Sequence, residues 1–188
     1  SRAAIQRICE VLDEPLDLTD SQISDDPQPE DGSIEFRNVS FQYNDSQADA
    51  PVLHDINLTI KSGQTIGILG GTGSSKTTLV QLIPRLYDTT EGEVLVGGRN
   101  VKDYKLDTLH DAVAMVLQKN VLFSGTIREN LRWGNPDATD EELIEAAKAA
   151  QAHDFIASFP QGYDTDLNQG GVNLSGGQKQ RLCIARAL

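Results

Sequence analysis

Apolar residues near the start of the chain recur at helical intervals. Ile5, Ile8, Cys9 and Leu12 occupy positions i, i+3, i+4 and i+7, which lie on one face of a helix. The spacing predicts a short amphipathic helix over residues 3–12, of the kind that ends a preceding domain.

From residue 33 onward the apolar positions alternate with polar ones, as they do in strands with one buried face. Ile34 and Phe36 alternate in one phase and Val39 continues in the opposite phase, which indicates a bulge or a break between two strands. Further alternating runs at residues 56–60 and 93–96 predict more strands. We expect a half-buried antiparallel layer.

Two apolar runs are continuous instead of alternating. Residues 65–69 predict a short strand that leads into a glycine-rich loop, and residues 77–87 after the loop have the pattern of a helix. Residues 112–117 are typical of a strand buried on both faces of a parallel sheet. Strand, loop and helix in this order are a phosphate-binding arrangement.

The last third of the chain is predicted to be mostly helical. Thr139 is followed three residues later by Glu142, and this pair forms a capping box. We expect a helix from there to about residue 158.

The formal charge of −12 is unevenly distributed. Residues 10–31 hold nine acidic side chains and no basic one, whereas residues 32–188 hold 14 basic and 19 acidic side chains, a net −5. The acidic stretch also contains three prolines and few apolar residues, and it predicts a solvated linker, with an acidic binding tail as the alternative. Much of the negative charge therefore lies outside the expected domain.

Several classes of protein are disfavoured by composition. The two cysteines, Cys9 and Cys183, have no metal-like or redox-like spacing. No run approaches 18 apolar residues, so these residues are not expected to span a membrane, although a membrane partner stays open. No polybasic surface is evident, and we expect no nucleic-acid partner.

The glycine-rich loop is close to the P-loop pattern. Small residues let backbone N–H groups surround phosphates, Lys76 can reach the β- and γ-phosphates, and the Thr77 hydroxyl can bind Mg²⁺. Ser75 stands where the strict pattern has glycine; if that position is left-handed, serine costs about 1–2 kcal/mol. An ordinary Gly/Ser turn is the alternative. The candidate nucleotide-binding residues are Gly70, Gly71, Thr72, Gly73, Ser74, Ser75, Lys76, Thr77 and Thr78.

A second motif begins at residue 174. Ser175 and Gln178 form a capping box, so a helix is expected to begin just after Ser175, with free N–H groups at two glycines. This helix end is a second candidate anion site, and it suggests a dimer in which each nucleotide lies between two subunits. A bare helix start is the alternative. The motif residues are Leu174, Ser175, Gly176, Gly177 and Gln178.

The two motifs together resemble the nucleotide-binding domain of ABC transporters, whose signature Leu-Ser-Gly-Gly-Gln is unaltered at residues 174–178. The resemblance extends from residue 33 to 188 and is strongest to the exporter branch. It implies an α/β fold with a P-loop NTPase core, an antiparallel β-subdomain and an α-helical signature subdomain, incomplete at the C-terminus. It also implies ATP and Mg²⁺ as cofactors.

The resemblance assigns roles to two further residues. Tyr43 matches the aromatic residue that stacks on adenine, with a plain core tyrosine as the alternative. Gln118 matches the glutamine that reaches Mg²⁺ and the attacking water, so the implied metal-binding residues are Thr77 and Gln118. An amide suits this role because it offers both a donor and an acceptor.

Residues 120–131 are similar to the exporter segment that meets the cytoplasmic loops of the transmembrane domain. Leu122 and Phe123 would be contact residues there, with core packing as the alternative. Residues 166–171 match the family's cross-talk loop only loosely.

The resemblance also divides the chain. Residues 1–31 are the helix and acidic linker that follow a transmembrane domain, and residues 32–188 are a partial nucleotide-binding domain. Within that domain the β-subdomain and P-loop core are expected at about 32–118, and the helical subdomain at about 119–188.

Hydrolysis requires a base for water and a second carboxylate for the metal. In the family both follow the signature helix, on the Walker B strand, with a switch histidine later, and none of them occurs in these 188 residues. We therefore expect the parent protein to hydrolyse ATP and this chain alone to be inactive, with a central sheet that lacks one member.

The function implied is an ATP-binding cassette domain that couples ATP binding and hydrolysis to export. Its partners would be a transmembrane domain and a second nucleotide-binding domain, in a homodimer or heterodimer at the cytoplasmic face of the membrane. A non-hydrolysing regulatory half, a soluble ABC ATPase without transport, and a nucleotide kinase are the alternatives; the kinase has no use for residues 174–178.

Overall fold

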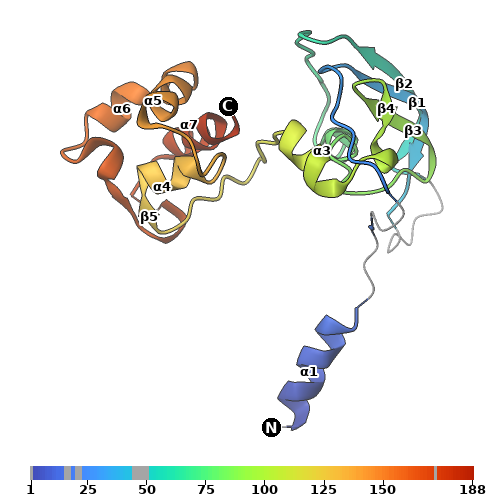
Figure 1. Cartoon of the computed structure of the whole chain (residues 1–188), viewed down its shortest axis with the longest axis horizontal. Coiled ribbons are helices and arrows are strands. Elements are labelled where there is room, and N and C mark those ends of the chain that lie inside the picture. Colours follow the sequence, from blue (N-terminus) through green and yellow to red (C-terminus); the bar gives the residue numbers. More distant parts are fainter. Residues whose placement is uncertain (1, 15–17, 20–22, 44–50, 172) are drawn as a thin grey trace. The chain divides into compact units, whose positions relative to one another are not determined.

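The computed structural model describes residues 2–14, 18–19, 23–43, 51–171 and 173–188. The chain divides into two compact units, Ser1–Val113 and Ala114–Leu188, called here the first and second units (Figure 1). Helix α1 (Arg2–Leu12) confirms the predicted amphipathic helix, and its apolar side chains at Ile5 and Leu12 are exposed. Within the described residues no helix is both long enough and apolar enough to cross a bilayer.

The first unit is built on one antiparallel sheet of strand order β2-β1-β3-β4 (Figure 1). The register of β1 with β2 shifts between Phe36 and Val39, which confirms the bulge predicted from the change of phase. Gly92 is required where β3 begins, because a Cβ atom there would lie 2.3 Å from two carbonyl oxygens of β1. The strands are β1 (Ile34–Phe41), β2 (Leu53–Ile60), β3 (Glu91–Val96) and β4 (Arg99–Asn100).

Helices cover the apolar side of this sheet and close the first core. Tyr104 is fully buried and donates its hydroxyl proton to the Val96 carbonyl at 2.8 Å, so its one polar atom is satisfied. Leu82 and Leu109 bring the helical segments into the same core as Val94. These segments are α2 (Lys76–Gln81), the 3₁₀ turn η1 (Val101–Asp103) and α3 (Leu106–Ala112).

The prediction of two central strands is wrong. Residues 65–69 and 113–117 form no strand, and Ala112 belongs to α3. An extended segment becomes a strand only when its N–H and C=O groups pair with a neighbour, and among the described residues neither segment pairs with another. Most of their apolar side chains are exposed, up to 97% for Leu69, while Val113 and Met115 are partly buried.

The helix predicted over residues 77–87 is shorter than expected. It ends at Gln81, and turns follow it. Pro84 disfavours helical backbone in the residue before it, and Arg85 has a left-handed φ of 52°. The apolar periodicity therefore continues past the end of the helix.

Part of the predicted solvated linker lies against the first unit. We call residues 23–31 the strap. The Asp26 carboxylate hydrogen-bonds the Thr108 hydroxyl on α3, and its other oxygen lies 3.5 Å from Lys105 Nζ. At Gly97 a Cβ atom would approach the strap backbone to 2.7 Å, so glycine permits this contact. The acidic stretch is thus not solvated throughout.

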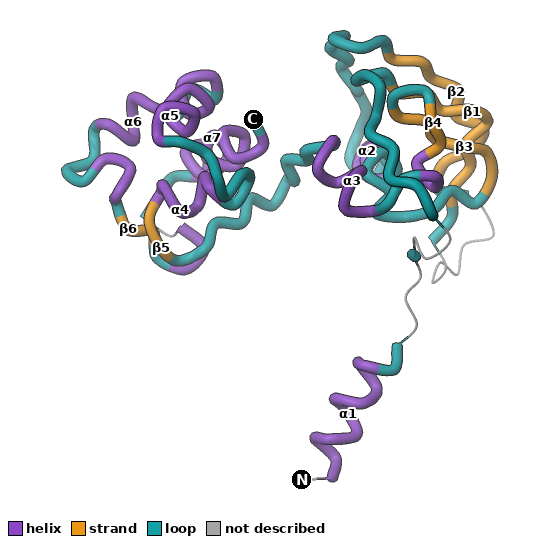
Figure 2. The backbone as a smooth tube through the Cα atoms, in the orientation of Figure 1, coloured by secondary structure: helices purple, strands orange, loops and turns teal. Residues whose placement is uncertain are grey.

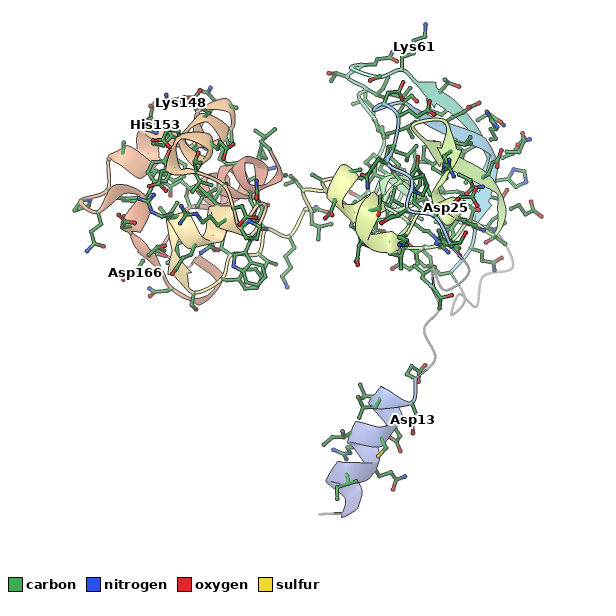
Figure 3. All side chains as sticks on the ribbon, in the orientation of Figure 1. Asp13, Asp25, Lys61, Lys148, His153 and Asp166 are labelled. Atoms are coloured by element: carbon green, nitrogen blue, oxygen red, sulfur yellow. The ribbon has the colours of Figure 1, made fainter. Side chains whose placement is uncertain are left out.

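We expect Thr108→Val to lower the free energy of unfolding of the first unit by about 1–2 kcal/mol, because the variant keeps the shape and loses a hydrogen bond to a carboxylate. Chemical denaturation measures this. The matched control is Asp25→Asn on the same strap, an exposed neighbour labelled in Figure 3. Equal stability of Thr108→Val and the unaltered chain would show that the Asp26 bond contributes nothing.

The second unit is mostly helical, as predicted (Figure 2). The capping box of Thr139 and Glu142 is present, but the helix it begins ends at Ala149, and Gln151 is left-handed at φ 56°. Its core contains Ile127, Ile156 and Leu182. The elements are β5 (Gly125–Thr126), α4 (Ile127–Arg132), α5 (Asp140–Ala149), α6 (His153–Ala157), η2 (Gly162–Asp164), β6 (Asp166–Leu167), η3 (Gln169–Gly171) and α7 (Gly176–Ala187).

A charged network joins three segments of the second unit. Arg128 on α4 pairs with Asp164 at 2.9 Å and with Asp140 at the start of α5, and Arg132 also pairs with Asp140, at 2.9 Å. The Arg128 guanidinium lowers the pKa of the Asp164 carboxyl below its ordinary value of 3.8.

We expect the pair of Asp164 with Arg128 to contribute to the acid sensitivity of the second unit. A carboxyl whose pKa is lower in the folded state stabilises the fold above its unfolded pKa, and the stabilisation is lost as pH falls through the folded pKa. We expect Arg128→Gln to lower Tm near neutral pH and to flatten the decline of Tm below about pH 4. Thermal unfolding across pH measures this, with Lys119→Gln as a charge-matched control on an exposed side chain. Parallel curves for Arg128→Gln and the unaltered chain would contradict the prediction.

Candidate nucleotide site

The glycine-rich loop before α2 is exposed and has the backbone of an anion-binding turn. Residues 70–73 are exposed, and Gly73 and Ser75 have left-handed φ values of 80° and 60° on either side of Ser74. Left-handed and right-handed residues in succession turn their N–H groups toward one concave side, which binds anions. The loop that the sequence singled out is therefore exposed and has left-handed backbone at two positions.

Lys76 folds back over this loop. Its ammonium donates to the carbonyl oxygens of Gly70 and Gly71, each at 2.7 Å, and to Ser74 Oγ at 3.0 Å. All three acceptors are neutral and belong to exposed residues. Phosphate oxygens are stronger acceptors for an ammonium than carbonyls are, so the lysine can exchange these bonds for bonds to an anion in the loop.

Ser75 occupies the left-handed position that the motif gives to glycine. Its φ of 60° and ψ of 19° lie in the region where a Cβ atom crowds the following carbonyl. The condition under which serine was expected to cost about 1–2 kcal/mol is thus met.

We expect Ser75→Gly to raise the free energy of unfolding by about 0.5–1 kcal/mol, since relief of the strain exceeds the added entropy of the unfolded chain. The matched control is Ser75→Ala, which keeps Cβ and should show no gain. Denaturation of the three proteins side by side tests this, and a gain in Ser75→Ala equal to that in Ser75→Gly would refute the role of strain.

Tyr43 lies beside the first turn of α2. Its hydroxyl is 2.9 Å from Thr78 Oγ1, and its ring meets those of Phe41 and Tyr87 at centroid distances of 4.8 and 5.2 Å. Both contacts are edge-to-face, the geometry that aromatic pairs prefer. The candidate base-stacking ring and the phosphate loop therefore belong to one cluster in the first unit.

The second motif begins α7 as its sequence predicted. Ser175 is the N-cap, and the reciprocal bonds with Gln178, at 2.9 and 3.3 Å, confirm the capping box. Gly176 and Gly177 are exposed, and nothing lies within 4 Å of a Cβ atom added to either. Leu174 is buried and anchors the turn. The N–H groups of Gly176 and Gly177 are thus open to solvent, whereas that of Gln178 donates to Ser175 Oγ.

Arg181 holds this helix end in place. It donates to the Gln151 carbonyl at 3.0 Å, and its guanidinium lies over the Phe155 ring at 5.1 Å from the centroid. The left-handed φ of Gln151 belongs to the turn that supplies this carbonyl. The break between α5 and α6, which the sequence did not predict, therefore supports the signature helix.

The remaining candidates fall in different units. Thr77 follows Lys76 in the first unit with an exposed side chain, and Gln118 is exposed in the second. Hydroxyl and amide oxygens are hard donors of the kind Mg²⁺ prefers, so the donor chemistry of the two residues fits this ion. Thr72 is exposed with the rest of the loop.

The segment expected to meet membrane loops divides between core and surface. Leu122 is 3% exposed and packs in the second core, so it is a core residue. Phe123 is 42% exposed and stacks on Trp133, itself 64% exposed, with centroids 4.5 Å apart. The two rings form an exposed aromatic pair on the surface of the second unit.

Sequence reasoning missed two residues that contact Phe123, one buried and one exposed. Asn130 is buried, accepts from the Phe123 N–H at 2.8 Å and donates to the Phe123 and Thr126 carbonyls at 2.9 and 3.0 Å. It therefore fixes the backbone that presents Phe123. Trp133 is the single tryptophan of the chain, and an exposed tryptophan just past a helix was the signal available for it.

Comparison with known proteins decides the family. A family profile described as ABC transporter matches residues 53–188, which is more than half of the chain. The chain belongs to the ABC transporter family. The ABC ATPase fold expected from the two motifs is thereby confirmed, with its antiparallel sheet and its helical part.

The relatives of this ABC domain are exporters. A multidrug export ATP-binding/permease protein of Staphylococcus aureus strain NCTC 8325 is 49% identical over 179 residues, which cover 95% of this chain and 31% of the relative. Its counterpart in the bovine strain RF122 is 48% identical over the same length. The solved structure of a bacterial Atm1-family ABC exporter with ATP bound matches with a TM-score of 0.89 at 34% identity, covering 97% of this chain and 32% of that one. This chain spans about a third of the length of these proteins.

Proposed function

We propose that this chain is an ATP-binding cassette domain that couples ATP binding and hydrolysis to the export of a substrate across a membrane. One observation carries the proposal: the same chain contains a glycine-rich loop covered by the Lys76 side chain and an exposed, capped signature helix end at Ser175. A nucleotide kinase has no use for the signature helix end, and the similarity to exporters supports a function in transport.

ATP would bind to the first unit through two groups of residues. The Tyr43 ring would stack on adenine, and the N–H groups of residues 70–78 would bind the phosphates together with the Lys76 ammonium. Mg²⁺, when bound, neutralises phosphate charge. The Thr77 hydroxyl of the first unit would bind the ion. The family resemblance assigns the Gln118 amide a role toward the same ion and toward a water.

The signature helix end would act on a nucleotide held by a second domain. Gly176 and Gly177 present open N–H groups to an anion, while the Ser175 and Gln178 side chains are engaged in the capping box. The partner domain can be a second copy or a homologue. A dimer of this kind closes when ATP is shared between the subunits and opens after hydrolysis.

The membrane partner would contact the aromatic pair of Phe123 and Trp133. Phe123 belongs to the segment, residues 120–131, that is similar to the part of exporters facing the cytoplasmic loops of the transmembrane domain, and Trp133, which stacks on it, lies just after this segment. In that arrangement the domain would lie at the cytoplasmic face of the membrane, with the transmembrane domain in the same polypeptide or the same complex. We propose no nucleic-acid partner.

The 188-residue chain by itself would bind ATP without hydrolysing it. Hydrolysis needs a base for water and a second carboxylate for the metal, and no acidic residue or histidine follows Gln178 in these residues. The chain nevertheless contains the loop, the lysine and the tyrosine that binding requires.

Titration with a fluorescent ATP analogue and Mg²⁺ tests the binding. We expect saturation below about 1 mM, in the usual range for nucleotide sites. No signal at millimolar ligand would refute the proposed site. Phosphate release is measured in parallel, and turnover that disappears in Lys76→Ala would overturn the claim that the chain alone does not hydrolyse ATP.

A further inference from the structure

Tyr87 lies beside Tyr43 in the first unit. Its ring meets that of Tyr43 edge-to-face with the centroids 5.2 Å apart, and it meets that of Phe41 at 5.5 Å. Tyr87 belongs to the turns that follow α2 and is 40% exposed. A half-exposed ring gains less from burial than a core ring does, so the backbone of its turn has to keep it against Tyr43.

Arg85 fixes this turn. Its guanidinium donates twice to the Asp88 carboxylate, from Nε to Oδ1 at 2.8 Å and from Nη2 to Oδ2 at 3.3 Å. Two parallel bonds between arginine and a carboxylate set the geometry as well as adding energy. Tyr87 lies between the two residues in the sequence, and the N–H of Leu86 bonds the Gln81 carbonyl at 3.0 Å, at the end of α2. The backbone around Tyr87 is therefore held on both sides.

The turn is costly to form. Arg85 is 5% exposed and has a left-handed φ of 52°, which residues with a Cβ atom rarely adopt. Its Nη1 atom is buried and has no hydrogen-bond partner among the described residues. Backbone strain and an unsatisfied buried donor persist only where the surrounding structure enforces them, and both are found at functional sites. Toward the candidate nucleotide site, this turn presents the Tyr87 ring to Tyr43.

We propose that Arg85 is a positioning residue: through its pair with Asp88 it holds the Tyr87 ring against Tyr43, and so orders the ring on which adenine would stack. This inference rests on the proposed stacking of adenine on Tyr43. Tyr43 keeps Phe41 and Thr78 as further partners, so loss of the Tyr87 contact would loosen its ring without freeing it. A nucleotide would then have to order the ring as it binds, which lowers affinity.

The phosphate side of the site should respond much less. Among the described residues, no hydrogen bond or ion pair joins residues 85–88 to the loop at residues 70–75. Lys76 keeps its bonds to that loop, and the first turn of α2 keeps the bond from the Leu79 N–H to the Ser75 carbonyl, at 3.0 Å. The effect of Arg85 is therefore expected for ligands that carry a base.

The prediction is a difference between two ligands. Arg85→Gln should weaken binding of ATP about 2- to 10-fold, the value of one aromatic ring contact, and change binding of inorganic triphosphate less than about 2-fold. Tyr87→Ala should show the same difference, and the double variant should be no worse than Tyr87→Ala, because Arg85 acts through that ring. Tyr87→Phe, which keeps the ring, should bind both ligands as the unaltered chain does.

Competition titrations against the fluorescent ATP analogue measure both ligands. The matched control is Arg37→Gln, which removes an exposed arginine that pairs with Glu35 and Glu93 on the sheet of the same unit and should change neither affinity. Unchanged ATP binding in Arg85→Gln, equal weakening of the two ligands, or additive losses in the double variant would overturn the positioning role.

Two further variants keep the test decisive. If Arg85→Gln does not fold, Arg85→Lys, which keeps the charge but cannot form both bonds to Asp88, should give the same difference between ATP and triphosphate, and its absence would overturn the proposal. Tyr43→Ala tests the premise. Unchanged ATP binding in Tyr43→Ala, or failure of the unaltered chain to bind either ligand, would instead refute the proposed function.

Discussion

Replacing Lys76 with alanine should weaken binding of ATP by about 10- to 100-fold, the value of charge-assisted hydrogen bonds to phosphate. The Lys76 ammonium lies over the loop carbonyls at 2.7 Å, and no other cation among the described side chains has a hydrogen bond to this loop. Titration with the fluorescent ATP analogue measures the loss.

The same substitution should leave folding almost unchanged, because every acceptor of Lys76 belongs to an exposed residue. Thermal unfolding checks this. Lys61→Ala, which removes the same charge from another exposed position of the first unit (labelled in Figure 3), is the matched control. If Lys61→Ala weakened ATP binding as much as Lys76→Ala, net charge and not the loop geometry would account for affinity.

Replacing Asn130 with alanine should lower the free energy of unfolding of the second unit by about 2–4 kcal/mol. The side chain is 2% exposed and makes three hydrogen bonds, and its loss would leave the N–H and C=O of Phe123 and the C=O of Thr126 without these partners. The fluorescence of Trp133, which stacks on Phe123, reports this unfolding directly.

The contact between Asn130 and Phe123 can be tested more finely with Asn130→Asp. The carboxylate still accepts from the Phe123 N–H, but it faces two carbonyls to which it cannot donate. We expect a loss of stability near neutral pH that is partly recovered in acid, where the carboxyl is protonated. Asn168→Ala, at an exposed position of the same unit, should have little effect. Full stability of Asn130→Ala would show that water replaces the side chain.

The features predicted correctly from sequence are those set by neighbouring residues. The capping boxes at Thr139 and Ser175 each depend on one side chain and one residue three positions later. The change of phase between Phe36 and Val39 likewise produces its bulge within a single strand. Capping boxes and bulges depend on residues close together in the sequence, so the residue pattern is enough to predict them.

The predictions that were wrong concern pairing and distance. Residues 65–69 have the apolar character of a central strand. A strand forms only when a neighbouring segment pairs with it, and the apolar pattern of one segment does not show whether such a neighbour is in place. The strap is largely exposed, in keeping with its acidic composition, but no pattern in the sequence indicated that Asp26 contacts Thr108, 82 positions away. Composition describes the average polarity of a segment, whereas a contact between two distant side chains depends on how the chain folds.

By itself the sequence determined the two glycine-containing motifs, the helix caps, the antiparallel layer and the resemblance to ABC transporters, because each depends on residue types at short spacing. Only the tertiary structure decided that Tyr43 contacts Thr78, that Asn130 supports Phe123, and that Leu122 is core while Phe123 is surface. Adjacent residues in an irregular segment have no fixed period that assigns one to the inside. Their burial follows from the chain packed around them, which is distant in sequence.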